Sequence, residues 1–206
     1  TQSYVKIPLF LGVDEEGGRV ARVSSNEDMG VDPIDAMGTF GESGDIASLY
    51  NAVSGLAAGI HALGLNFDFA PVADVSSGKN SVIGDRSFGT DASLCASMVS
   101  VAASALTDSG VVPCLKHFPG YGSASADDHN GPAEVTKTLE ELEQCDLVPF
   151  ISGIEKGAPF IMVSHLSVPA LTGGDMPCDL SYEAVTETLR NKMGFTGVII
   201  TDAQNM

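Results

Sequence analysis

The most reactive stretch of the sequence begins where an apolar run ends. Residues 111–115 are apolar, and Lys116 and His117 follow them directly. A loop rich in glycine and proline then leads to Asp127 and, two residues later, to His129. A lysine at the end of a buried strand is costly unless it meets an anionic or hydroxyl partner. We therefore expect Lys116 and His117 to converge on a ligand.

An aspartate near the other end of the chain completes a set of groups suited to glycoside hydrolysis. A retaining glycosidase needs one side chain to attack the anomeric carbon and another to protonate the departing oxygen. Asp202 follows the apolar run 197–201 and is placed to attack. His129 titrates near neutrality, so it can give a proton and then take it back. Asp127 can hold the ring of His129 in one tautomer.

Two other functions stay open at this point. A metal-dependent hydrolase would gather histidines and aspartates around one or two divalent ions. No H-x-H or H-E-x-x-H motif occurs and the four histidines are dispersed, which argues against a metal site. The second alternative is a sugar-binding fragment without turnover.

Strand and helix patterns alternate along the chain. The helical segments are capped or closed by Ser, Thr, Asp or Gly, and they cover residues 42–63, 92–109, 138–156 and 181–194. The strands are short and continuously apolar, and they cover residues 7–13, 65–70, 111–115, 159–164 and 197–201. Such strands belong to parallel sheets that are covered on both faces. The chain is thus expected to be an α/β domain built from βαβ units.

Polar residues follow the strands and separate two fold classes. In chain order they are Asp14, Asp74, Lys116, His165 and Asp202. Groups at successive strand ends suit a (β/α)8 TIM-barrel, whose active site lies at the carboxyl ends of its strands. An open doubly wound sheet would carry a G-x-G-x-x-G loop, which the glycine pair after the first strand does not match. The sequence favours the barrel.

The number of strands limits how much of a barrel is present. Five strands and four helices are predicted, whereas a closed barrel needs eight of each. We expect residues 1–206 to form a single, partial barrel domain that is truncated at both ends. Apolar strand edges left open in this way favour self-association.

Composition restricts the partners and the compartment. The formal net charge is −17, from 27 acidic and 10 basic residues, and such a surface repels nucleic acids and anionic membranes. No apolar run approaches the roughly 20 residues that span a bilayer. The four cysteines stand singly without a C-x-x-C pair. Reduced thiols favour the cytoplasm, and export stays open.

Six short motifs, taken together, resemble one enzyme family. In chain order they are residues 13–22 (VDEEGGRVAR), 69–75 (FAPVADV), 84–89 (GDRSFG), 116–122 (KHFPGYG), 127–129 (DDH) and 201–206 (TDAQNM). Their order and content are similar to the N-terminal catalytic barrel of glycoside hydrolase family 3. The similarity is greatest to the bacterial β-N-acetylglucosaminidase, or β-N-acetylhexosaminidase, branch.

The resemblance implies a role for each matching residue. Asp202 would be the nucleophile that forms a covalent glycosyl-enzyme intermediate. His129 paired with Asp127 would be the general acid/base. Five residues would hold the hydroxyl and acetamido groups of the sugar, and they are Asp14, Arg22, Arg86, Lys116 and His117. His165 and Asp74 are secondary candidates for substrate binding, and no metal or organic cofactor is expected. Glu15 stands where the family usually carries glutamine.

The resemblance also implies a substrate. The expected reaction is the retaining removal of terminal β-linked N-acetylglucosamine from wall-derived or chitin-like oligosaccharides, as in peptidoglycan recycling. A phosphorylase or a β-glucosidase of the same family is the alternative within this class. The paired Asp127 and His129 favour the N-acetylglucosaminidase over the β-glucosidase.

Overall fold

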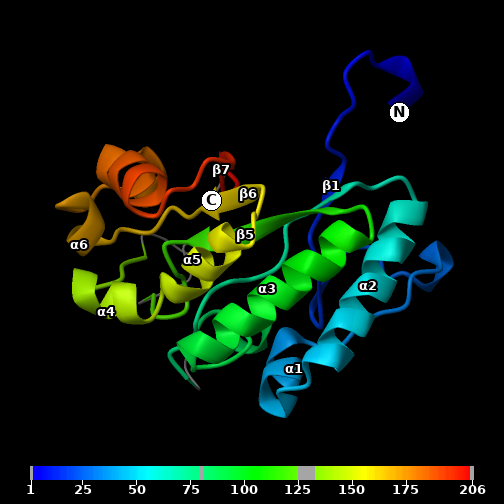
Figure 1. Ribbon diagram of the computed structural model, residues 1–206, viewed down its shortest axis with the longest axis horizontal. Helices are drawn as coiled ribbons and strands as arrows, with labels where there is room; N and C mark the ends of the chain where they lie inside the picture. The colour runs from blue at the N-terminus through cyan, green and yellow to red at the C-terminus, as the bar shows by residue number, and fades with distance from the viewer. Residues whose placement is uncertain (1, 79–80, 125–132, 205–206) are drawn as a thin grey trace.

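The computed structural model describes residues 2–78, 81–124 and 133–204. Its main sheet has five parallel strands (Figure 1). In chain order they are β1 (Gly12–Val13), β4 (Phe67–Asp68), β5 (Val112–Phe118), β6 (Phe160–Val163) and β7 (Val198–Thr201). A separate two-stranded hairpin pairs β2 (Glu15–Gly17) with β3 (Val20–Ala21) directly after β1.

The strand order decides between the two fold classes. The order in the sheet is β1-β4-β5-β6-β7, so each strand lies beside the next main-sheet strand along the chain. An open doubly wound sheet reverses its order at a switch point, whereas a barrel adds strands in one direction. The five predicted strands are all present, and their order is the one a barrel requires. In the part of the chain that the structure describes, β1 and β7 are the edges of this sheet.

The two faces of the sheet have different partners because successive side chains of a strand point to opposite sides. Phe67, Cys114, Phe160 and Met162 form a small apolar cluster on one face. Phe10 packs edge-on against Phe67 and Phe160, with ring centroids 5.7 and 5.1 Å apart, yet it stays 61% exposed. This is the face that a closed barrel would enclose.

Helices cover the opposite face, which holds the larger core (Figure 1). The helices are α1 (Met37–Ser43), α2 (Ile46–Ala62), α3 (Ala92–Asp108), α4 (Leu139–Gln144), α5 (Val148–Glu155), α6 (Pro169–Thr172) and the π-helix η6 (Glu183–Lys192). Short 3-10 turns are η1 (Gln2–Tyr4), η2 (Glu27–Met29), η3 (Gly84–Arg86) and η5 (Cys178–Leu180). Helix α3 packs against α2, α5 and β5 and is therefore the centre of this layer.

Two of the four predicted helices are interrupted. The helix predicted over residues 42–63 breaks at Gly44, whose φ of 67° is left-handed, and Asp45 then caps α2 by accepting from the Ser48 amide. The helix predicted over residues 138–156 begins with the expected Thr138 capping box but stops at Cys145. Pro149 lies in the first turn of α5, where its missing N–H costs no helical hydrogen bond.

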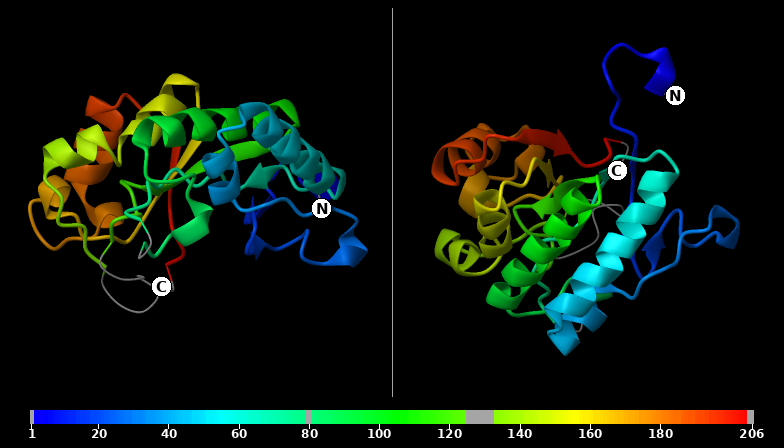
Figure 2. Two further views of the ribbon diagram at one scale, coloured as in Figure 1. Left: turned by 90° about the horizontal axis from the view of Figure 1, so that it is seen from below. Right: turned by 45° about the vertical axis from the view of Figure 1, so that its right-hand side comes forward.

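The first predicted strand is shorter than its apolar run. Only Gly12–Val13 pairs in the sheet, and the segment before it projects from the body of the domain (Figure 2). No helix of the described residues is long and apolar enough to span a bilayer.

Candidate active site

The predicted polar residues lie at the carboxyl ends of the sheet strands. Asp14 follows β1, Lys116 and His117 lie near the end of β5, and Asp202 follows β7. Because the strands are parallel, these ends meet at one edge of the sheet. The resulting contacts form a continuous network from Asp14 to Asp202.

Lys116 is the buried cation at the centre of this network. Its side chain is only 3% exposed, and Nζ lies 2.6 Å from Asp14 Oδ1 and 2.7 Å from Glu16 Oε1. Burial lowers the pKa of Lys116, but the Glu16 and Asp14 carboxylates outweigh it, so the pKa is above its ordinary value. Two of the three ammonium protons have carboxylate partners, and the third can meet a ligand hydroxyl.

Glu16 joins Lys116 to the second predicted cation. Arg86 donates from Nε to Glu16 Oε2 and from Nη2 to Glu16 Oε1, both over 2.8 Å. Burial would raise the pKa of Glu16, but hydrogen bonds and charge from Arg86 and Lys116 hold it at about 2. Sequence reasoning missed Glu16. Its position in the same motif as Asp14, two residues later, is the signal that was available.

His117 is held by a carboxylate beneath it. Asp74 Oδ2 lies 2.8 Å from His117 Nδ1, and Asp74 Oδ1 accepts from the backbone amides of His117 and Tyr121. Since Asp74 is 1% exposed and fully engaged, it positions His117 rather than facing the open side. The Nδ1–H tautomer leaves Nε2 as an acceptor, 3.5 Å from Arg86 Nη2.

Asp202 completes the described cluster. Its Oδ2 lies 4.0 Å from His117 Nε2, and its side chain is 21% exposed. The backbone amide of Asp202 donates to the Val163 carbonyl, so the sheet ladder fixes its position. Asp14, at 42% side-chain exposure, and Asp202 are thus the most accessible carboxylates of the network.

The other predicted residues are not part of the described network. Arg22 follows β3 and is exposed. His165 follows β6 and contacts Asp179 and the Ala203 carbonyl. Asp127 and His129 lie outside the described residues, so their predicted roles stay predictions.

Comparison with known proteins decides the family. The model of the glycosyl hydrolase family 3 N-terminal domain matches residues 1–206. The chain belongs to this family. Its fold is therefore the TIM-barrel type that the strand pattern predicted, and the described part of this family 3 chain supplies five of the strands.

Curated relatives of this family 3 chain are β-hexosaminidases. It is 34% identical over its whole length to beta-hexosaminidase A of Pseudoalteromonas piscicida, covering 36% of that protein. It is 39% identical over 92% of its length to beta-hexosaminidase LpqI of Mycobacterium tuberculosis, covering 47% of that protein. The chain thus spans less than half the length of both relatives.

Solved structures give the same result. A family 3 β-N-acetylglucosaminidase from Paenibacillus sp. matches with a TM-score of 0.91 and 34% identity, over 97% of this chain and 38% of that one. Native NagZ from Neisseria gonorrhoeae matches with a TM-score of 0.90 and 31% identity, over 98% of this chain and 59% of that one. The resemblance to the β-N-acetylglucosaminidase branch of family 3 is confirmed by the curated relatives and by the solved structures.

Glu15, which differs from the residue usual in the family, has a structural role in this chain. It is 1% exposed, and its carboxylate accepts from the Val23 amide over 2.6 Å and from the amide and hydroxyl of Ser24. These bonds close the turn that follows the β2–β3 hairpin. Glu15 therefore shapes the segment that carries Arg22.

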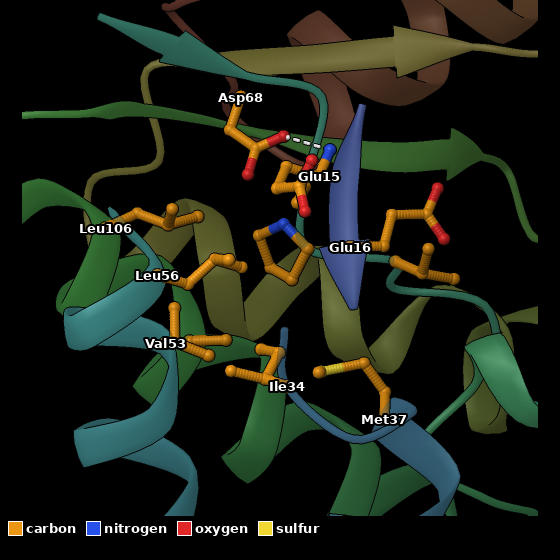
Figure 3. Close-up of a pocket in the computed structure, with 12 residues that line it drawn as sticks. Glu15, Glu16, Ile34, Met37, Val53, Leu56, Asp68 and Leu106 are labelled. Carbon is orange, nitrogen blue, oxygen red and sulfur yellow. Dashed lines mark hydrogen bonds between the residues drawn. The ribbon is translucent and has the colours of Figure 1, made fainter. Parts of the chain in front are cut away.

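Asp68 lies beneath the network of this family 3 domain and was not predicted. It is fully buried and accepts from the Glu15 amide through Oδ1 over 3.0 Å (Figure 3). Burial is the main reason that the pKa of Asp68 is well above its ordinary value. Its surroundings include Val53, Leu56 and Leu106 around a small cavity of about 10 Å³. Such a site favours the neutral acid.

Helix α1 supports the segment that carries Arg86. A Cβ on Gly41 would lie 1.6 Å from the Phe88 carbonyl oxygen, and a Cβ on Gly38 would lie 3.2 Å from the Asp85 carbonyl oxygen. The backbone of residues 85–88 therefore lies directly on the glycine face of α1.

Residues 2–78, 81–124 and 133–204 contain no group of three or more His, Cys, Asp or Glu side chains arranged to hold a metal ion. Lys116 and Arg86 instead occupy the centre of the carboxylate cluster.

Proposed function

We propose that this chain forms most of the catalytic site of a retaining β-N-acetylhexosaminidase. The reaction is the removal of terminal β-linked N-acetylglucosamine from wall-derived or chitin-like oligosaccharides. The observation that carries the proposal is the position of Asp202. It is a partly exposed carboxylate 4.0 Å from His117, in the same cluster as the Asp14–Lys116 pair.

The sugar is held by the polar side of the cluster. Carboxylates accept from sugar hydroxyls, whereas Lys116 donates to them. Asp14 is open enough to accept, and Lys116 has a donor left after it binds Asp14 and Glu16. Arg86 and the exposed Arg22 supply further donors, and His117 Nε2 supplies an acceptor. Because contacts within the network already hold Lys116, Arg86 and His117 in place, little ordering of these side chains is needed when the sugar binds.

Asp202 then acts as the nucleophile. Its carboxylate attacks the anomeric carbon while the aglycone leaves, which gives a glycosyl ester on Asp202. The second displacement by water breaks this ester and restores the β configuration. His117 Nε2 lies 4.0 Å from Asp202 Oδ2, and Arg86 Nη2 lies 3.5 Å from the same ring nitrogen, so both side chains border the nucleophile.

Proton transfer is proposed for His129, with Asp127 orienting its ring. Protonated His129 gives its proton to the departing oxygen, and neutral His129 later takes one from the attacking water. Both residues follow the motif at residues 116–122 closely in the sequence.

The compartment and assembly are further parts of the proposal. All four cysteines are free, and three of them are buried, which supports a reducing compartment such as the cytoplasm. The acidic surface supports a neutral carbohydrate partner rather than nucleic acid or an anionic membrane. Apolar groups near the edges of the sheet support self-association of the isolated chain.

The test uses the full-length protein with 4-nitrophenyl N-acetyl-β-glucosaminide and the matching glucoside. We expect faster turnover of the N-acetylglucosaminide, with no requirement for phosphate. In Asp202→Asn, turnover should fall by at least about 1,000-fold while the sugar still binds, since only the nucleophile is lost. Retained turnover in this variant would remove Asp202 from the mechanism.

Asp85→Asn is the matched control. Asp85 lies in a neighbouring motif, but its side chain is 59% exposed and pairs only with the exposed Arg19 among the described residues. Its substitution should leave turnover unchanged. Turnover that depends on phosphate, with a sugar phosphate as product, would replace hydrolysis by phosphorolysis.

A further inference from the structure

His165 occupies a position between two acceptors. Its Nδ1 lies 3.1 Å from Asp179 Oδ2, and its Nε2 lies 3.1 Å from the Ala203 carbonyl oxygen. Asp179 belongs to η5, and its side chain is 3% exposed, whereas Ala203 follows β7. The ring therefore connects the end of β6 with two other segments.

The two acceptors determine the protonation of the ring. A neutral imidazole has one N–H and one lone pair, so one of its nitrogens would face an acceptor without a proton to share. Only the imidazolium donates from both nitrogens. The geometry at His165 is thus satisfied by the charged form.

Ala203 transmits this contact to Asp202. The Ala203 amide donates to Asp202 Oδ1 over 2.7 Å, while the Ala203 carbonyl accepts from His165. A second bond in the same turn runs from the Gln204 amide group to the Thr201 hydroxyl. Holding Ala203 therefore fixes the direction of the Asp202 carboxylate.

We propose that His165, in its charged form and anchored by Asp179, is a positioning residue that sets the orientation of the Asp202 carboxylate. This inference rests on the proposed function of Asp202 as nucleophile. It replaces the expected role of His165 in holding the sugar. Raising the pH removes one ring proton and thereby releases either the Asp179 or the Ala203 contact.

The groups around the ring also favour the charged form of His165. Partial burial lowers the pKa of His165, but the Ala203 carbonyl and the Asp179 and Asp202 carboxylates outweigh it, so the pKa is above its ordinary value. A raised histidine pKa means that the contact is complete below the ordinary value near 6.5. The contact is lost as the pH rises through the higher value of the folded protein.

The test compares Asp179→Asn with the wild-type full-length protein. The asparagine keeps the size of the side chain but removes its charge. Ring protonation is read from the NMR spectra of 15N-histidine-labelled protein, and kcat and KM for 4-nitrophenyl N-acetyl-β-glucosaminide are measured from pH 5 to about 9. His61→Asn, on the exposed surface of α2, is the histidine control.

We expect both nitrogens of wild-type His165 to carry protons at pH values near 6. In Asp179→Asn the pKa of the ring should fall by roughly half a unit to one unit. A decline of kcat on the alkaline side should move to lower pH with it, while KM stays unchanged. His61→Asn should show neither change.

Three outcomes would overturn the inference. They are a single neutral tautomer of His165 near pH 6, a kcat profile that does not move although the ring pKa falls, and an equal change in KM. Absence of turnover in the wild type would contradict the proposed function instead. In that case the contact is decided by hydrogen exchange of the Ala203 amide, which must be faster in Asp179→Asn than in His61→Asn at the same alkaline pH.

Discussion

Arg86 and Glu16 form a two-point ion pair in which two nitrogens of one side chain meet two oxygens of the other, each over 2.8 Å. Glu16 in turn contacts Lys116, so one buried carboxylate orders both cations of the site. The planar guanidinium matches a carboxylate in a way that a lysine ammonium does not. The orientation of the site therefore depends on this pair.

Arg86→Lys should weaken the site although it keeps the charge. We expect the free energy of unfolding to fall by about 1–3 kcal/mol and kcat/KM to fall by roughly tenfold, because one of the two hydrogen bonds to Glu16 is lost. Chemical denaturation and steady-state kinetics measure the two effects. Arg19→Lys, on an exposed arginine, should stay within about 0.5 kcal/mol of wild type. Equal losses in both variants would contradict the prediction.

Glu16 should make the free energy of unfolding depend on pH in the acidic range. Its pKa is lowered from 4.5 to about 2 in the folded protein. A lowered carboxylate pKa stabilises the folded state above the unfolded value, and this contribution disappears as the pH falls through the folded value. The shift corresponds to about 3 kcal/mol. The difference in unfolding free energy between wild type and Glu16→Gln should be largest above pH 4.5 and shrink toward pH 2.

Asp68 should behave in the opposite way. Its pKa is raised, so the neutral acid is favoured in the folded protein, and stability is lost as the pH rises above the ordinary aspartate value. We expect Asp68→Asn to be at least as stable as wild type at neutral pH, with an advantage that vanishes in acid. Asp68→Ala should lose about 1–3 kcal/mol, because the buried Glu15 amide loses its acceptor. Strong destabilisation by Asp68→Asn would show that the carboxylate must be ionised.

Asp74→Asn tests how His117 is held. The amide oxygen can still accept from the backbone amides of His117 and Tyr121, but the amide nitrogen then faces His117 Nδ1. This forces the proton of the ring to Nε2, where it points at the Arg86 guanidinium. We expect kcat/KM to fall by roughly tenfold or more with little change in melting temperature. Unchanged kinetics would mean that the ring tautomer is irrelevant to the reaction.

The isolated 206-residue chain should self-associate. Phe10 and Val198 are 61% and 48% exposed near the two edges of the sheet, and open apolar edges favour pairing with other chains. Val198→Lys on β7 should reduce the apparent mass in light scattering. Tyr4→Lys, at a residue 90% exposed in the N-terminal segment, is the control and should have no effect. A monomeric wild-type chain would contradict the prediction.

The strands were predictable because each is a short apolar run that ends in a polar residue. The run predicted at residues 111–115 is present as β5, which begins at Val112 and continues through Lys116 and His117 to Phe118. The interruptions of the helices were harder to foresee. Gly44 and Cys145 break helical patterns that continue on both sides, so periodicity alone joined them.

The sequence predicted which residues belong to the site better than it predicted which of them contact one another. Asp14, Lys116 and His117 were named from their places after strands, and the structure brings them together with Asp202. Which carboxylate meets which cation depends on contacts between residues up to 102 positions apart, such as that between Asp14 and Lys116. No local pattern carries this information, and Asp68 was missed for that reason, whereas Glu16 had a signal in its position two residues after Asp14.

Because α1 contacts the backbone of residues 85–88, the position of Arg86 depends on a helix in the outer layer. Any side chain at position 41 would push the Phe88 carbonyl, and with it the neighbouring Arg86, away from Glu16. Residue 41 therefore has to be part of a helix and to lack a side chain at the same time. Substitutions in α1 can therefore shift Arg86 without changing any residue of the polar network.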